Sequence, residues 1–79
     1  VLGKRNLLKY FINCGIKIDA TDSHGNTSLI WASLSGNSDI VSLLLDSGAD
    51  SDIQNVNGET ALMYATINEN IEIVKLLLK

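Results

Sequence analysis

The sequence predicts an all-α fold, a solenoid in which short helix pairs stack on one another. The first observation is an internal repeat: residues 22–46 and 55–79 share ten identities in 25 positions when the chain is shifted by 33. The second is that each copy contains two helix-start signals, each followed by apolar residues at helical spacing. A fixed period of 20–50 residues is typical of stacked arrays, whose units bury their apolar faces against one another.

The identities occupy positions with distinct structural roles, so they indicate a repeated unit and not a chance match. They include a turn glycine, a threonine, small and apolar helix positions, an asparagine and three successive leucines. In the first copy these residues are Gly25, Thr27, Leu29, Ala32, Asn37, Ile40, Val41, Leu43, Leu44 and Leu45.

Each unit begins with a turn and a short helix. Asp22 and Gly25 stand at the first and last positions of a predicted β-turn. In the second copy, Asn57-Gly58 predicts a tight turn because both residues tolerate a positive φ. Thr27 is expected to cap the first helix, and Gly36 to end it in a left-handed conformation.

The second helix of the unit is predicted to start at Asn37 or Ser38 and to end at Gly48. Ile40 to Leu45 give this helix a broad apolar stripe. Residues 49–54 then run extended to the next turn. Helices this short are not stable alone, so stacking must supply their stability.

A third, partial copy precedes these two. Residues 1–21 match the last half of a unit, with Gly15 aligned to Gly48. We therefore divide the chain into residues 1–21, the C-terminal half of a repeat; residues 22–54, a full repeat; and residues 55–79, a repeat that stops after its second helix. Because neither end carries a dedicated polar cap, we expect the chain to be part of a longer array.

The pattern Gly-x-Thr-x-Leu-x-x-Ala over residues 25–32, followed by Ile-Val-x-Leu-Leu-Leu-x-x-Gly-Ala-Asp over residues 40–50, resembles the ankyrin repeat. The resemblance covers the whole chain. It implies antiparallel inner and outer helices, with β-hairpin-like fingers projecting at right angles. Ser28 and Ala61 stand where the family usually has proline, which is helpful but not required at the first helical position. Glu69 replaces the glycine equivalent to Gly36, so we expect strain there and a loop of different shape.

The sequence contains no catalytic constellation, so we expect no enzyme activity. His24 is the only histidine and Cys14 the only cysteine, too few for a triad or a zinc site. The stretch starting at Asp50 mimics a calcium loop but lacks glycine at its sixth position and a carboxylate at its twelfth. We therefore expect no cofactor and no metal.

Charge and hydropathy limit the partners further. The net charge is −3 and no basic stripe is present, so we expect no nucleic-acid binding. No apolar run approaches the roughly 20 residues of a membrane-spanning helix, and we expect no membrane insertion. The single cysteine weakly favours a reducing compartment, so the expected location is the cytoplasm, with the nucleus also possible.

Trp31 and Tyr64 occupy equivalent positions in successive repeats. One interpretation is packing within the stack. The other is an aromatic pair that contacts a partner, since both residue types are enriched at binding hot spots. We favour packing.

The ankyrin resemblance implies protein–protein interaction. We predict that finger loops and the concave surface of the inner helices bind another protein or peptide, and that the chain is a monomer. Alternatives are a regulatory or substrate-recruiting region of a larger enzyme or channel, and a structural spacer. Leu34 and Ile67 are the predicted apolar anchors. The predicted partner-binding residues are Ser23, His24, Asn26, Leu34, Ser35, Val56, Asn57, Glu59, Ile67 and Asn68.

Overall fold

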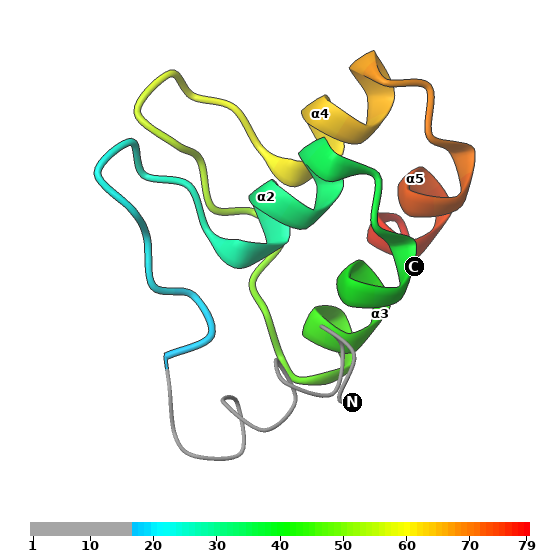
Figure 1. The fold of residues 1–79 in the computed structure, drawn as a ribbon, viewed down its shortest axis with the longest axis horizontal. Helices are drawn as coiled ribbons and strands as arrows, with labels where there is room; N and C mark the ends of the chain where they lie inside the picture. Colours follow the sequence, from blue (N-terminus) through cyan, green and yellow to red (C-terminus); the bar gives the residue numbers. More distant parts are fainter. Residues whose placement is uncertain (1–16) are drawn as a thin grey trace, which may run out of the picture.

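Two stacked helix pairs form the part of the protein that the structure, a computed structural model, describes, which is residues 17–79 (Figure 1). Within these residues there are four helices and no strand: α2 (Ser28–Ser35), α3 (Ser38–Asp46), α4 (Ala61–Ile67) and α5 (Ile71–Leu77). The inner helices α2 and α4 pack against each other, as do the outer helices α3 and α5, and each inner helix packs on its own outer helix. The predicted all-α solenoid is confirmed. Most of the partial copy over residues 1–21, Cys14 included, lies outside the described residues.

Side-chain caps start all four helices. Thr27 Oγ1 accepts a hydrogen bond from Ile30 N at 3.2 Å to start α2, as predicted. Thr60 repeats this contact in α4. Asn37 starts α3 in the same way, and Asn70 starts α5. Each cap satisfies a backbone N–H that has no partner inside its helix, an effect worth about 1 kcal/mol.

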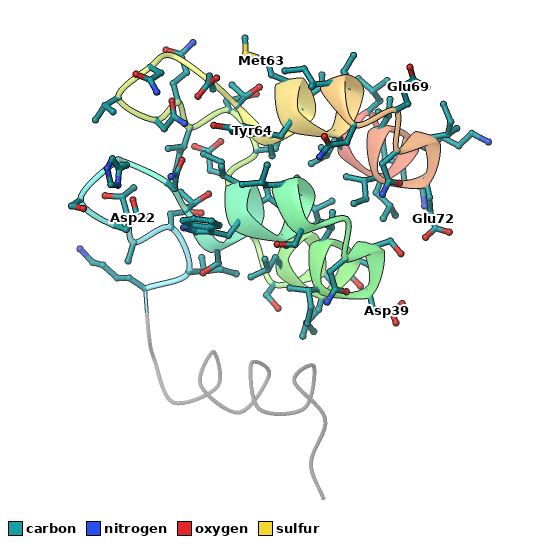
Figure 2. All side chains as sticks on the ribbon, turned by 45° about the horizontal axis from the view of Figure 1, so that its top comes forward. Asp22, Asp39, Met63, Tyr64, Glu69 and Glu72 are labelled. Carbon is teal, nitrogen blue, oxygen red and sulfur yellow. The ribbon has the colours of Figure 1, made fainter. Side chains whose placement is uncertain are left out.

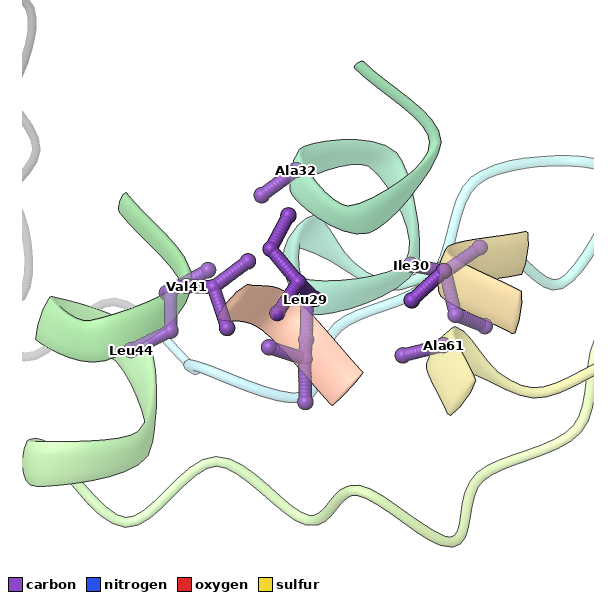
Figure 3. Close-up of a cluster of buried hydrophobic side chains, with 8 residues drawn as sticks. Leu29, Ile30, Ala32, Val41, Leu44 and Ala61 are labelled. Atoms are coloured by element: carbon purple, nitrogen blue, oxygen red, sulfur yellow. The ribbon is translucent and has the colours of Figure 1, made fainter. Parts of the chain in front are cut away.

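The core lies between the helix pairs (Figure 3). The predicted helix face, Leu29, Ala32 and Ser33, is buried, and so is Ile30. Ser33 Oγ is buried without a hydrogen-bond partner. Alanine on α4 lets the two inner helices approach closely. The core cluster consists of Leu29, Ile30, Ala32, Val41, Leu44, Ala61, Ala65 and Ile73.

The loop between inner and outer helix has one shape in both repeats, contrary to our expectation. Gly36 has φ 75° and Glu69, its equivalent, has φ 55°. The loop closes with Asn37 N donating to Ala32 O at 3.0 Å, and the next repeat makes the same closure at 2.9 Å. The packing of the flanking helices therefore holds Glu69 in a left-handed conformation that a side chain disfavours.

Each finger contains a four-residue turn, and the first lies at the predicted place. Gly25 N donates to Asp22 O at 3.0 Å, and Gly58 N donates to Asn55 O at 2.9 Å. Both glycines have positive φ, but Asn57 does not. The Asn57-Gly58 pair is therefore not the centre of a turn with two left-handed residues; Gly58 is the fourth residue of a turn that begins at Asn55.

Candidate functional site

The two fingers, residues 22–26 and 55–59, lie side by side and project from the N-terminal ends of the inner helices (Figure 1). A backbone hydrogen bond joins them, from Val56 N to His24 O at 2.9 Å. The fingers approach so closely at Gly25 that a Cβ there would lie 3.1 Å from Asn55 Cα. The fingers are thus one joined surface, and not two independent loops.

Asp22 organises the first finger. Its Oδ1 accepts from the backbone N–H groups of His24 and Asn26, both at 2.9 Å. Its Oδ2 accepts from Trp31 Nε1 at 2.9 Å. The Asn26 N–H and then the Trp31 indole hold the pKa of the Asp22 carboxyl below its ordinary value, because both hydrogen bonds favour the ionised form.

Asn55 occupies the equivalent position in the second finger and is buried. Its Oδ1 accepts from Asn57 N and Glu59 N, both at 3.0 Å, as Asp22 does in the first finger. Its Nδ2 lies within hydrogen-bond distance of three acceptors: Asn26 Oδ1 at 2.9 Å, Glu59 Oε1 at 3.1 Å and Tyr64 Oη at 3.2 Å. The contact to Asn26 crosses between repeats, so Asn55 fixes both the shape of its finger and its distance to the neighbour.

Glu59 and Tyr64 complete this network. Tyr64 Oη donates to Glu59 Oε1 at 2.6 Å. This hydrogen bond, followed by the Asn55 amide, lowers the pKa of the Glu59 carboxyl. The same hydrogen bond raises the pKa of the Tyr64 phenol, because ionising it would remove the donated proton beside a carboxylate.

The aromatic pair agrees only in part with the packing interpretation. Tyr64 is half-buried and packs against the core cluster. Trp31 has an exposed fraction of 49%, so the packing interpretation is wrong for it. Its indole N–H reaches towards the finger, where Asp22 offers a carboxylate oxygen. Each aromatic therefore ties its inner helix to its own finger through a polar contact.

Eight of the ten predicted binding residues are exposed, and two are not. Asn26 and Glu59 are half-buried, and their side chains accept hydrogen bonds from Asn55. Asn26 joins the two fingers, and Glu59 stabilises the second finger internally, so both are less free to vary than the finger tips. The exposed eight are Ser23, His24, Leu34, Ser35, Val56, Asn57, Ile67 and Asn68.

The C-terminal ends of the inner helices are also joined. Asn68 Nδ2 donates to Leu34 O at 3.1 Å, so two predicted binding residues lie in contact across the repeat boundary. Ile67 lines an open hollow of about 370 Å³ on α4 with Glu59, Leu62, Met63 and Thr66. The Asn68 side chain therefore ties the residue after the anchor Ile67 to the backbone of the anchor Leu34, and apolar surface lies beside Ile67.

Three residues of this region were not predicted. Asp22 was assigned only to a turn, and no role was given to Asn55 or to the exposed Met63, whose side chain points away from the helices (Figure 2). One sequence signal could have revealed the first two. The first copy has Asp22 and, nine residues later, Trp31, whereas the second copy has Asn55 and Tyr64 at the equivalent positions. The members of each pair can hydrogen-bond to each other.

Across residues 17–79, no group of three or more His, Cys, Asp or Glu side chains gathers closely enough to hold a metal ion. No helix in this part of the chain has the length and apolar character to span a membrane.

Comparison with known proteins agrees with the geometry. The family described as ankyrin repeats, in three copies, matches residues 2–79. No curated protein matches the chain.

Proposed function

Since the chain belongs to the ankyrin repeat family, whose members are generally protein–protein interaction modules, we propose that it binds a protein or peptide through its finger tips and the inner-helix surface. The proposed contacts are the exposed residues Ser23, His24, Leu34, Ser35, Val56, Asn57, Ile67 and Asn68, with Asn26 and Glu59 supporting the fingers.

One observation carries this proposal: each inner helix has an exposed apolar side chain at the same repeat position, at or next to its last residue. Leu34 has an exposed fraction of 39% although the next repeat packs beside it, and Ile67 has 72%. Exposed apolar groups that recur along a joined surface are candidate anchors for a partner. The mostly polar finger tips lie towards the opposite, N-terminal ends of the inner helices (Figure 1) and would add polar contacts there, as the rim of a typical interface does.

The joined fingers favour a preformed surface. Hydrogen bonds from Val56 N to His24 O and from Asn55 to Asn26 hold the two loops in one arrangement before any partner arrives. Less conformational entropy is then lost on binding. A protein or an extended peptide that spans both repeats fits such a surface.

The test is selection of peptides from a displayed random library on the immobilised 79-residue chain, followed by affinity measurement in solution. We expect the variant with both Leu34→Glu and Ile67→Glu to bind the selected peptides at least about tenfold more weakly, because a buried apolar contact is worth more than 1.4 kcal/mol. The matched control is Leu78→Glu, an equally apolar exposed residue after the outer helix α5.

Circular dichroism of all variants establishes that they fold. Equal affinity of the folded double variant and the wild-type chain would contradict the proposal, and would favour a structural spacer. Loss of binding in the Leu78 variant alone would assign the contact to the outer helices.

A further inference from the structure

The Asn57-Gly58 pair in the second finger has a chemical reactivity that its place in the turn does not use. The backbone nitrogen of the residue after an asparagine can attack the side-chain carbonyl carbon and close a five-membered ring. Glycine at that next position favours the attack, because it has no Cβ to hinder the ring and its backbone rotates freely. Of the eight asparagines in the sequence, Asn57 is the only one that precedes a glycine.

The structure leaves room for this reaction at Asn57. The Asn57 side chain is exposed. A Cβ placed on Gly58 would have no atom within 4 Å beyond its chain neighbours, so both the ring and an attacking water fit there. The amides of the other described asparagines already have structural roles. Asn37 and Asn70 cap helices, whereas Asn26, Asn55 and Asn68 join the two repeats.

The closed turn holds the attacking nitrogen back. Gly58 N donates to Asn55 O at 2.9 Å. The Asn55 side chain closes the same turn, because its Oδ1 accepts from Asn57 N and Glu59 N, both at 3.0 Å. The nitrogen must lose its proton before it attacks, and an N–H that is bonded inside a turn is protected from solvent base. The reaction therefore requires local opening of the finger.

We propose that Asn57 is a deamidation site and that Asn55 controls its rate by keeping the turn closed. After opening, Gly58 N gives its proton to solvent base and bonds to Asn57 Cγ. The bond from Cγ to the amide nitrogen breaks, and this nitrogen takes up a proton and leaves as ammonia. Water then opens the succinimide. Opening at Cγ gives aspartate at position 57, and opening at the backbone carbonyl carbon gives isoaspartate.

Either product changes the finger. Both place a carboxylate where a neutral amide was exposed. The pKa of the Glu59 carboxyl is lowered by Tyr64, then by Asn55, and to a smaller degree by the Asn57 amide. A carboxylate in place of that amide repels Glu59 instead. Isoaspartate also adds a carbon atom to the main chain before Gly58, so the hydrogen bond from Gly58 N to Asn55 O loses its register.

The test is incubation of the 79-residue chain at pH 8, in buffer and in guanidinium chloride. Anion-exchange chromatography measures the gain of negative charge, and mass spectrometry of fragments locates it. We expect the folded chain to deamidate at least about tenfold more slowly than the unfolded one, because opening breaks several hydrogen bonds and a factor of ten corresponds to about 1.4 kcal/mol. Asn57→Gln should remove the reaction, since a glutamine must close a six-membered ring, which forms much more slowly.

Two further variants test the control by Asn55. Asn55→Ala removes both side-chain contacts that close the turn, so the folded variant should deamidate several-fold faster than the wild type. Asn26→Ala is the matched control. It removes the contact between the fingers but leaves the Asn55 Oδ1 contacts in place, and it should change the rate much less. Circular dichroism establishes which variants fold.

An Asn57→Gln chain that gains charge as fast as the wild type would overturn the site. Equal rates for the wild type in buffer and in guanidinium chloride would overturn control by the turn, and this comparison stands even where Asn55→Ala does not fold. An unchanged rate in folded Asn55→Ala would overturn the role of Asn55. The reaction does not depend on the proposed function: a chain that deamidates at Asn57 but binds no peptide would contradict that function alone.

Discussion

Replacement of Asn55 should be among the most damaging single changes outside the apolar core. Asn55 accepts two backbone hydrogen bonds and offers two amide hydrogens to three nearby acceptors. Asn55→Ala therefore removes up to four hydrogen bonds from a buried position. At roughly 0.5–1.5 kcal/mol each, with water replacing some at the edge, the free energy of unfolding should fall by about 2–4 kcal/mol. The total free energy of unfolding of a chain of this size is roughly 4–12 kcal/mol.

Asn55→Asp is the sharper test, because it changes one donor group into an acceptor and keeps the shape. The backbone contacts of Oδ1 survive, but the second oxygen faces the Glu59 carboxylate. Asn26 can rotate its amide to donate to the new carboxylate, whereas Glu59 has no proton to offer at neutral pH. We expect a loss at pH 7 at least as large as that of Asn55→Ala, and a smaller loss at acidic pH, where one carboxylate of the pair takes up a proton.

The assay is urea unfolding followed by circular dichroism and by Trp31 fluorescence. Asp22→Asn is the matched control, since it makes the reverse change at the equivalent position and should lose only the acceptor for the Trp31 indole. Its effect should be smaller than that of Asn55→Asp, with a shift in Trp31 emission. An Asn55→Asp variant within 0.5 kcal/mol of the wild type at pH 7 would refute the role given to the amide.

Further predictions concern backbone strain and pH. Gly25→Ala should destabilise the chain more than Gly58→Ala, because both glycines have positive φ but only at Gly25 would the new Cβ meet backbone of the next finger, at 3.1 Å; urea midpoints of the pair decide this. Glu69→Gly should raise the free energy of unfolding by about 1 kcal/mol, because glycine adopts the left-handed conformation without the steric cost of a side chain. No gain in the free energy of unfolding would show that the loop is unstrained. The Asp22 and Glu59 carboxyls have folded-state pKa values below their ordinary ones, so the stability that they add is present above the unfolded-state pKa, near 4, and is lost as pH falls through the lowered values. Unfolding measured from pH 7 to pH 2 should show this loss, and the combined variant Asp22→Asn with Glu59→Gln should show a flatter profile.

The helices were predictable because their signals are local. A cap such as Thr27 accepts a hydrogen bond from an N–H only three residues away. Once the helices of the first copy are predicted, the 33-residue period predicts the helices of the second copy at equivalent positions. The left-handed Gly36 follows from the same local logic. Its equivalent Glu69 shows the limit: packing of whole helices fixed the loop shape there, against the preference of the residue itself.

The finger network was not predictable in the same way. Asn55 contacts Asn26 at a sequence separation of 29, and that contact exists only when two repeats stack in register. Sequence spacing placed both residues on fingers but could not show that one amide joins them. The packing prediction for Trp31 was wrong for a related reason. The repeat pattern marks its position as apolar, but the indole N–H donates to Asp22 on the finger and about half of the side chain stays exposed.

The same comparison of repeats sharpens the assignment of the two apolar anchors. Ile67 is exposed for two reasons: it lies at the end of an inner helix, and no repeat follows α4 in the described residues. Leu34 lies beside a following repeat and keeps an exposed fraction of 39%, so only the first reason applies to it. Part of the exposed Ile67 surface therefore has no equivalent at Leu34. Leu34→Glu alone is therefore the cleaner test of partner binding, because the exposure of Leu34 in the presence of a following repeat does not depend on the end of the stack.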